Sequence, residues 1–302
     1  MYDIIVIGAG PAGLTAALYA LRADKTVLVL EKATFGGQIT FSPQIENYPG
    51  FAKMSGNEFA DKLVDQVISQ GADIEMETVT GIRDNGNTKT VITEDGEHEA
   101  KAVIIATGVK HRQTGLPNEN ELVGEGVSYC AVCDGAFFKG QTVAVLGGGN
   151  SALQEAVLLS DGCEKVYVIQ NLEYFTGEAR LVEKLKEKDN VEFIMGTVIS
   201  SLNGSSSLES LTLRKEADGS ESELKVNGLF VAIGLIPNNK IFEEIAGLDE
   251  WGYIDSDESC VTKTAGVFVA GDCRKKQIRQ ITTAAADGSV AALAACRYID
   301  SL

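Results

Sequence analysis

Residues Tyr2–Gly13 read YDIIVIGAGPAG, an apolar run followed by three closely spaced glycines. The run Tyr2–Ile7 is typical of a parallel strand that is buried on both faces. A helical pattern follows over Leu14–Arg22, and Thr26–Leu30 has the composition of a second buried strand, ending at Glu31. Strand, glycine turn, helix and strand together predict a βαβ unit that binds a nucleotide.

The glycines of this turn have separate tasks in binding a dinucleotide. Gly8 allows a tight turn, Gly10 lets the backbone approach a pyrophosphate, and Gly13 lets the helix pack on the strand. The first N–H groups of the helix are unpaired and favour an anion. Glu31 lies 21 residues beyond Gly10, where a carboxylate can accept hydrogen bonds from a ribose diol. The candidate cofactor-binding residues of this turn are Gly8, Gly10, Pro11, Ala12, Gly13 and Glu31.

The same pattern of strand, glycine turn, helix and strand occurs again later in the chain. Val143–Leu146 is predicted as a strand, Leu153–Ser160 as a helix and Val166–Ile169 as the next strand. The turn between the first strand and the helix has the pattern G-x-G-x-x-A. Two such units in one chain imply two dinucleotide sites. The candidate residues of the second site are Gly147, Gly149, Asn150, Ser151 and Ala152.

Gly and Pro punctuate the chain near Thr114–Pro117 and Ile236–Asn239, as in linkers. If these segments are hinges, residues 115–238 form a domain inserted into another one. The outer domain is then discontinuous and consists of residues 1–114 and 239–302. The predicted fold class is α/β, with two Rossmann-like three-layer domains, the second inserted into the first.

Composition excludes several classes of protein. The 302 residues are 44% hydrophobic and 23% charged, which is ordinary for a globular protein. The net charge of −17 disfavours nucleic acid as a partner. Apolar runs are strand-sized, so no membrane span is expected. Residues 1–7 lack the basic start of a signal peptide, and we expect a cytoplasmic protein.

Of six cysteines, only Cys130 and Cys133 are close in sequence. A C-x-x-C pair in a cytosolic protein is typically catalytic or metal-binding. At the start of a helix one thiol can become a thiolate, which disulfide exchange requires. A zinc site is disfavoured because there is no second pair and the only histidines are His98 and His111, so no metal is expected. A buried inert pair is the remaining alternative.

Several segments, in order, resemble the bacterial low-molecular-weight thioredoxin reductases, which are two-domain FAD- and NAD(P)-binding pyridine nucleotide-disulfide oxidoreductases. Ile7–Gly13 resembles their FAD motif, and Gly36–Gln38 and Glu46–Gly50 resemble segments that line the flavin. Ala270–Asp272 resembles the second FAD motif, and Arg279–Ile281 resembles the helix start beneath the isoalloxazine. The resemblance covers essentially the whole chain. Two further predicted strands, Ala102–Ala106 and Gly266–Ala270, end in Thr107-Gly108 and Gly271-Asp272. Together with these strand ends, the resemblance implies further FAD-binding residues at Gly37, Gln38, Asn47, Thr107, Gly108, Gly271, Asp272, Arg279, Gln280 and Ile281.

The resemblance also implies the roles of the redox residues. Cys133 would face the flavin, Cys130 would attack the substrate disulfide, and Asp134 would protonate the leaving thiolate. A simpler interpretation makes Asp134 a helix cap. The implied activity is that of an FAD-dependent thioredoxin-disulfide reductase, a homodimeric flavoprotein with a redox-active disulfide and a thioredoxin-like protein as its partner.

The electron donor stays open because the chain departs from the family pattern after Val166–Ile169. Relatives that use NADPH carry a His-Arg-Arg cluster and a further Arg there, and these bind the 2′-phosphate. This chain has Gln170-Asn171-Leu172 and Thr176 instead. NADH, or either nucleotide, is favoured because the glycine turn is intact. The alternatives are NADPH bound through Arg180 or Lys184, and a protein donor such as ferredoxin or flavodoxin.

Other functions compete with this interpretation. A peroxiredoxin-system reductase or a dithiol oxidase could use the same cysteines. A ferredoxin–NADP reductase is disfavoured because such relatives lack the cysteine pair. The non-enzymatic alternative is a flavin-bound redox sensor without fast turnover. Dithiol-dependent turnover with thioredoxin separates the sensor from the enzyme.

Overall fold

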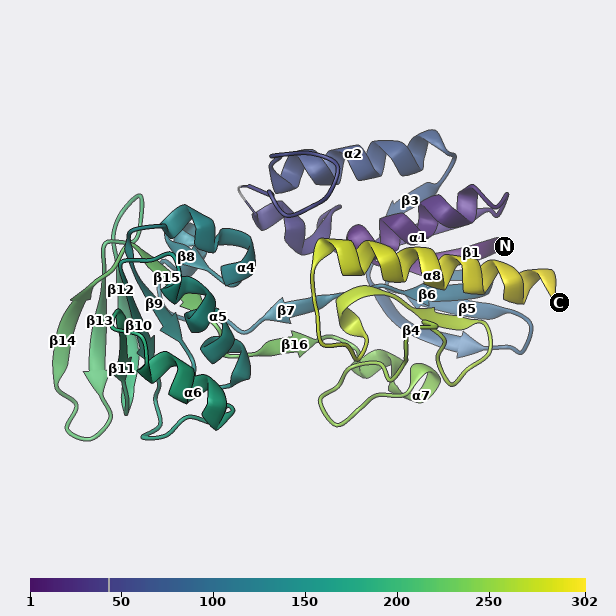
Figure 1. Cartoon of the computed structure of the whole chain (residues 1–302). Coiled ribbons are helices and arrows are strands. Elements are labelled where there is room, and N and C mark those ends of the chain that lie inside the picture. The colour runs from purple at the N-terminus through teal and green to yellow at the C-terminus, as the bar shows by residue number, and fades with distance from the viewer. Residues whose placement is uncertain (43) are drawn as a thin grey trace. The chain divides into compact units, whose positions relative to one another are not determined.

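The computed structural model describes residues 1–42 and 44–302. The chain consists of two compact units (Figure 1). Unit 1 comprises Met1–Lys110 and Ile236–Leu302, and unit 2 comprises His111–Leu235. Each unit is built on a parallel sheet covered by helices, which confirms the predicted α/β class. The chain leaves unit 1 in β7 (Val109–His111) and returns in β16 (Leu235–Pro237), and these two short strands pair with each other.

The sheet of unit 1 centres on the first predicted strand. In order of pairing its strands are β3 (Asp73–Met76), β2 (Val27–Glu31), β1 (Tyr2–Ile7), β6 (Glu97–Ile105), β5 (Lys89–Thr93) and β4 (Val79–Asp84), and β17 (Val267–Val269) also pairs with β6. The strands β3, β2, β1, β6 and β17 are parallel. The N-terminal half of β6 continues instead into an antiparallel meander with β5 and β4, which the sequence pattern did not indicate.

The helices of unit 1 are α1 (Pro11–Leu21), α2 (Gly56–Ser69), α7 (Glu243–Ala246) and α8 (Ile281–Asp300), with 3-10 turns η1 (Gly37–Phe41), η3 (Lys240–Phe242) and η4 (Gly271–Cys273). α1 begins at Pro11, three residues before the predicted start at Leu14. Proline suits the first helical position because its φ is already helical and its missing N–H would be unpaired there.

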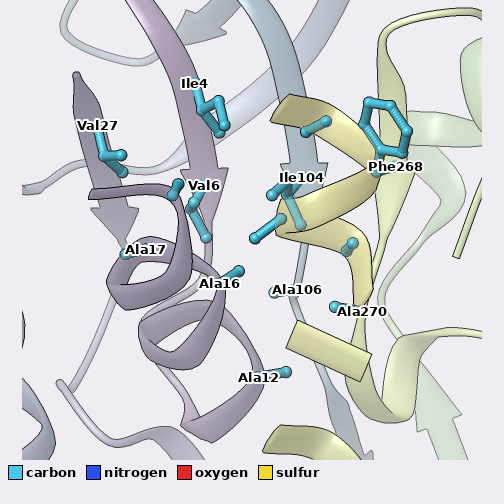
Figure 2. Packing of buried hydrophobic residues seen from close by; sticks show 14 of the residues in the cluster. Ile4, Val6, Ala12, Ala16, Ala17, Val27, Ile104, Ala106, Phe268 and Ala270 are labelled. Carbon is cyan, nitrogen blue, oxygen red and sulfur yellow. The ribbon is translucent and has the colours of Figure 1, made fainter. Parts of the chain in front are cut away.

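The core of unit 1 joins the two ends of the chain. Figure 2 shows Ile4 and Val6 of β1, Ile104 of β6 and Ala16 of α1 in this cluster, and each of them is fully buried. Helix α8 packs directly on α1. A Cβ atom added at Gly288 would lie 2.2 Å from the carbonyl oxygen of Ala12, so the two helix backbones approach closely only because glycine has no side chain.

Unit 2 repeats this plan on a smaller scale. Its parallel sheet has the order β11 (Val191–Ile194), β10 (Lys165–Ile169), β9 (Thr142–Leu146), β15 (Gly228–Val231) and β8 (Val127–Ser128). A second, antiparallel sheet consists of β12 (Thr197–Asn203), β13 (Ser210–Lys215) and β14 (Glu221–Lys225). The helices are α3 (Glu119–Leu122), α4 (Ala131–Asp134), α5 (Asn150–Ser160) and α6 (Ala179–Lys186), with a 3-10 turn η2 (Gly135–Phe138).

Helices and antiparallel strands bury opposite faces of the parallel sheet of unit 2. Leu153 and Leu159 of α5 join Val143 and Val145 of β9 in one cluster. The other face packs against the antiparallel sheet through residues such as Leu211. In the part of the chain that the structure describes, no helix has the length and apolar character needed to span a membrane.

Candidate cofactor and redox sites

The strand ends of unit 1 bring together segments that are far apart in the sequence. Ile7 of β1 pairs with Leu30 of β2 and with Ile105 of β6, and Ile105 pairs with Val269 of β17. These strands are parallel, so their carboxyl ends meet at one edge of the sheet, where α/β proteins bind nucleotides. The predicted residues that follow the four strands here are Gly8, Glu31, Thr107, Gly108, Gly271 and Asp272.

The first glycine turn has the geometry of a phosphate cradle. Gly8 adopts a left-handed φ of 109°, and a Cβ there would lie 2.4 Å from the Ala106 carbonyl oxygen. A Cβ at Gly13 would lie 1.8 Å from the oxygen of Gly8. Gly10 is the N-cap of α1 and brings no capping side chain, so the first N–H groups of the helix are open to an anion.

Backbone N–H groups hold the Glu31 carboxylate at the end of β2. One oxygen accepts from Ala9 N at 2.9 Å, inside the glycine turn. The other accepts from Lys32 N and Ala33 N, both at 2.9 Å. The side chain is therefore fixed beside the turn, as a ribose-binding carboxylate requires.

The segment after β2 folds back onto the turn. Gly36 N donates to the Ala9 carbonyl at 2.7 Å, and a Cβ at Gly37 would lie 3.4 Å from the Cα of Gly10. The Gln38 amide donates to the Val109 carbonyl at 2.7 Å. Gln38 and Gly37 thus lie at the same sheet edge as the turn.

The C-terminal candidates belong to the same assembly. Gln280 caps α8, which begins at Ile281, through reciprocal hydrogen bonds with Thr283. The Asn47 amide donates to the Gln280 side chain at 3.2 Å. The Thr107 hydroxyl donates to Asn239 at 3.2 Å. Unit 1 therefore brings together predicted residues from seven separate segments of the chain.

Asp272 carries an unused acceptor at this edge. Its Oδ1 is buried and has no hydrogen-bond partner among the described residues. Burial raises the pKa of the Asp272 carboxyl to about 6, although Lys276 and Arg279 act in the opposite direction. Arg279 donates from Nε to the Asp272 carbonyl at 3.3 Å, and its guanidinium lies over the ring of Tyr253.

These features fit FAD. The glycine turn brings strand, turn and helix closer together than a Cβ at Gly8 or Gly13 would allow, and the N-terminus of α1 offers N–H donors to a pyrophosphate. The free oxygen of Asp272 can accept a hydrogen bond from a ligand hydroxyl. A buried carboxylate oxygen without a partner costs free energy, and such a ligand would remove that cost.

The second glycine turn, in unit 2, has the same backbone conformation as the first. Gly147 has a φ of 137°, and a Cβ there would lie 2.5 Å from the Ala232 oxygen. Gly149 is the N-cap of α5, whose first residues are Asn150, Ser151 and the fully buried Ala152. A dinucleotide pyrophosphate therefore fits this turn as well.

The strand end beside the second turn differs from that of unit 1. Gln170 is only 6% exposed, and its amide donates to the Tyr174 carbonyl at 3.2 Å. The segment that follows closes over the turn, since Thr176 N and Gly177 N donate to the Gly148 oxygen at 2.9 and 3.0 Å. Of the two polar residues at this strand end, Gln170 is thus used internally and Asn171 is exposed.

Acidic groups lie beside this second turn. The Asn150 side chain accepts from Glu178 N at 2.7 Å and donates to a Glu178 carboxylate oxygen at 3.3 Å. Arg180, which was a candidate for holding a 2′-phosphate, pairs with Glu178 at 2.5 Å. The residues present fit a pyrophosphate, and they offer no free cation at positions 170–176 for a further phosphate.

Cys130 and Cys133 form a disulfide, with Cα atoms 5.3 Å apart. Cys130 is the N-cap of α4, and Cys133 N donates to its sulfur at 3.2 Å. Both residues are partly exposed, as a disulfide that exchanges with another protein must be. The other cysteines are buried thiols: Cys163, Cys260, Cys273 and Cys296.

Asp134 lies directly after the disulfide. Its Oδ2 accepts from the Ser128 hydroxyl at 2.6 Å, and the same hydroxyl accepts from Cys130 N at 3.1 Å. Its Oδ1 is buried without a partner within the described residues. Burial raises the pKa of Asp134, and the Ser128 hydrogen bond opposes this only in part. Asp134 precedes η2, and its side chain makes no capping hydrogen bond to that turn.

Glu155 is a second carboxyl near the disulfide helix, and the sequence pattern did not indicate it. It lies on α5 next to the buried residue Ala156, and burial raises its pKa, although the N–H of Ala131, the first residue of α4, acts in the opposite direction. The available signal was an acidic residue within the apolar face of a helix. Among the residues described, no group of three His, Cys, Asp or Glu side chains has the arrangement of a metal site.

Two glycine turns on parallel sheets, and a disulfide beside a buried carboxyl, define a nucleotide-binding disulfide oxidoreductase. The family model described as pyridine nucleotide-disulphide oxidoreductase matches residues 2–288. The chain is 39% identical to a thioredoxin reductase of Bacillus subtilis, over 100% of this chain and 96% of that protein. It is 40% identical to the "34.2 kDa protein in rubredoxin operon" of Clostridium pasteurianum, over 98% and 97% of the two chains.

Among solved structures, a thioredoxin reductase from Streptococcus pyogenes matches with a TM-score of 0.96 and 38% identity, covering 100% of this chain and 99% of the other. The chain therefore belongs to the pyridine nucleotide-disulphide oxidoreductases, in their low-molecular-weight thioredoxin reductase branch. It is a flavin-dependent oxidoreductase whose family uses FAD and a pyridine nucleotide.

Proposed function

We propose that the chain is an FAD-dependent thioredoxin-disulfide reductase, in which Cys130 and Cys133 transfer two electrons to a thioredoxin-like protein. The observation that carries this proposal is the disulfide that lies beside Asp134 in a unit with a nucleotide turn. The full-length similarity to proteins named thioredoxin reductase supports the substrate. Bound FAD supplies the two-electron chemistry between the donor and this disulfide.

The residues of unit 1 bind and orient the flavin nucleotide. Gly8, Gly10 and Gly13 receive the pyrophosphate, Glu31 takes the ribose, and Asp272 accepts from the remaining polyol part. The other residues proposed to line the site are Pro11, Ala12, Gly37, Gln38, Asn47, Thr107, Gly108, Gly271, Arg279, Gln280 and Ile281. In this proposal residues 1–114 and 239–302 form the FAD-binding domain.

The residues of unit 2 carry out the exchange with the partner. In the reduced protein the Cys130 thiolate attacks the partner disulfide, and Cys133 then displaces the partner and restores the Cys130–Cys133 bond. Asp134 holds the proton that the leaving thiolate takes, because burial keeps its carboxyl protonated to higher pH than usual. Residues 115–238 form this domain, and the protein functions as a cytoplasmic homodimer.

NADH, or either nicotinamide nucleotide, is the proposed donor at the second turn. Gly147, Gly149, Asn150, Ser151 and Ala152 form an intact cradle for a pyrophosphate. The strand end carries neutral residues, so it provides no fixed charge that would select NADPH.

Ferredoxin or flavodoxin is the second candidate donor. The amide of Gln170 and the side chain of Asn150 are already used within the protein, which leaves fewer groups for a nucleotide. One relative is also named for its place in a rubredoxin operon.

Anaerobic reduction of the flavin by NADH, NADPH and reduced ferredoxin in turn tests the donor. The proposal expects reduction by NADH at least as fast as by NADPH. Fast reduction by ferredoxin alone would replace the nucleotide with the protein donor. A protein that binds no flavin would contradict the proposed function itself.

Two serine variants test the roles of the cysteines. Cys130→Ser should lose thioredoxin reduction and leave Cys133 as a thiolate beside the flavin, with a long-wavelength charge-transfer band. Cys133→Ser should lack that band. The opposite pattern would reverse the two roles. Repeated turnover of the wild type with thioredoxin, followed through the dithiol that forms, distinguishes this enzyme from a flavin-bound redox sensor.

A further inference from the structure

A second carboxyl lies against the helix that carries the disulfide. Helix α5 packs against α4, and the Ala131 N–H of α4 acts on the Glu155 carboxyl of α5, where it favours the ionised form. Ala131 directly follows Cys130. The Oε2 atom of Glu155 is buried and has no partner among residues 1–42 and 44–302. Glu155 therefore belongs to a helix that packs against the disulfide helix, and its buried Oε2 is free to carry a proton.

Asp134 and Glu155 have the same unusual property. Each carboxyl has one oxygen that is buried without a partner in the described structure. A buried carboxyl that is also acted on by a second carboxyl does not ionise readily, so its proton is held to higher pH. Burial first, and then the charge of Asp134, raise the pKa of Glu155 to about 8, and the Ala131 N–H opposes this shift.

The charged groups on the other elements packed against α5 interact with residues other than Glu155. On α6, Arg180 pairs with Glu178 and Lys186 pairs with Glu183, and Lys184 acts on Asp161. On β10, Lys165 pairs with Glu192. Within the described residues, Asp134 is the one charged group whose field shifts Glu155. The cations of these elements therefore do not stabilise the ionised form of Glu155.

We propose that Glu155 is a proton reservoir for the Cys130/Cys133 dithiol. It acts through Asp134, by supplying the proton that Asp134 passes on. This inference rests on the proposed thioredoxin-reductase function and assigns a role to a residue outside the C-x-x-C-D motif. Pairs of carboxyls in unlike environments are a general way to keep one proton available near neutral pH.

The reaction needs more than one proton transfer. Two electrons move from the enzyme dithiol to the partner disulfide, whose S–S bond breaks as the Cys130–Cys133 bond forms. Two protons leave the enzyme thiols and end on the two partner thiols. Asp134 gives its proton to the first leaving thiolate, takes one from Glu155, and gives that proton to the second leaving thiolate. The two protons released by the enzyme thiols then restore Asp134 and Glu155.

The test compares wild type with Glu155→Gln across pH. The amide keeps the shape of the side chain and can still accept from Ala131 N, but it holds no exchangeable acid proton. Dithionite-reduced protein is mixed with oxidised thioredoxin in a stopped-flow instrument between about pH 6 and pH 9. We expect wild type to be about tenfold faster than the variant at the acidic end. The ratio should fall towards one above the pKa of Glu155, where the reservoir is empty.

The rate ratio distinguishes a proton reservoir from a structural role. Ionisation of the thiols affects both proteins alike and cancels in the ratio, whereas a packing defect would give a ratio that does not change with pH. Glu155→Asp should restore the pH dependence because it restores the acid. Glu183→Gln, an exposed position on α6, is the matched control and should give a ratio of one throughout. A constant ratio for Glu155→Gln would overturn the inference.

Infrared spectroscopy of the oxidised protein separates this inference from the proposed function. A protonated-carboxyl band that titrates near pH 8 in wild type and is missing in Glu155→Gln needs no thioredoxin. Its absence from wild type overturns the reservoir, even if the enzyme turns over. A wild type that reduces no thioredoxin but shows the band overturns the proposed function, and the role of Glu155 with it.

Discussion

The two glycine turns of this chain have nearly the same backbone but different strand ends. Gly8 and Gly147 both have a left-handed φ, and Gly10 and Gly149 both cap helices of 11 residues. In unit 1 the next strand ends in a carboxylate, which three N–H groups hold beside the turn. In unit 2 it ends in a buried amide directed at the chain's own backbone. A turn of this kind therefore indicates a pyrophosphate, and the strand end indicates which nucleotide.

A second difference is the third small residue of each motif. Gly13 leaves no space at all, since a Cβ would be 1.8 Å from the oxygen of Gly8. Ala152 occupies the corresponding place in unit 2, and its methyl group is fully buried. The helix of unit 1 thus lies closer to its turn, and this difference leads to the largest predicted effect.

Gly13→Ala should weaken FAD binding by about 100-fold. The added methyl group cannot fit, and overpacking against backbone costs about 3 kcal/mol, or about 100-fold in affinity. Flavin absorbance after gel filtration, compared with wild type, measures the effect. Retention of stoichiometric FAD would show that α1 can move away from β1, and that the two turns are less different than their contacts indicate.

Glu31→Gln should weaken FAD binding by about tenfold. The amide keeps the size of the side chain but puts an NH₂ group against N–H donors, and a hydrogen bond to a charged group contributes about 1.5–3 kcal/mol. Equilibrium titration of the apoprotein with FAD measures the loss. Glu58→Gln, at an exposed position on α2, is the control and should bind as wild type does. Equal FAD affinities for wild type, Glu31→Gln and Glu58→Gln would show that Glu31 does not contribute to FAD binding.

Wild type should show no preference for NADPH over NADH, and Asn171→Arg/Leu172→Arg should gain several-fold in NADPH use. Each new guanidinium can form charge-assisted hydrogen bonds with a 2′-phosphate, and about 1.4 kcal/mol corresponds to a factor of ten. Stopped-flow flavin reduction at low ionic strength provides the comparison. A wild type that strongly prefers NADPH would mean that other residues bind the phosphate. A double variant without any gain would mean that this strand end does not face the adenosine ribose.

Ala152→Gly should have the smallest effect, because it makes the second turn resemble the first. The variant loses about 1 kcal/mol of stability, as glycine does relative to alanine inside a helix. FAD content should not change, since the residue belongs to unit 2. Thermal unfolding and flavin absorbance test both statements. Loss of flavin from this variant would be inconsistent with the assignment of FAD to unit 1.

The sequence predicts the βαβ elements well because their signals are local. An apolar run, a glycine turn and a helical pattern follow directly upon one another, and β1, β9 and β10 lie within a residue of their predicted limits. The antiparallel strands β4, β5 and β12–β14 carry no such signal. Their side chains alternate irregularly between buried and exposed, and the pairing depends on strands elsewhere in the chain.

The site was only partly predictable for a similar reason. The motif alone marks Cys130 and Cys133 as a redox pair, and the disulfide agrees with that prediction. The environment of Glu155 depends on how α5 packs against α4, and the sequence shows only an acidic residue on a helix. The inward direction of Gln170 likewise depends on the Tyr174–Gly177 segment that closes over Gly148.

The contact between α1 and α8 has a consequence for biosynthesis. The core of unit 1 is complete only when β17 has paired with β6 and α8 has packed on α1, and both partners come from the last part of the chain. Unit 2 is one continuous segment, which leaves the ribosome before that part is made. Because domains fold as units during synthesis, unit 2 should reach its native state first. The redox disulfide pair would then be in place before the protein can retain its flavin.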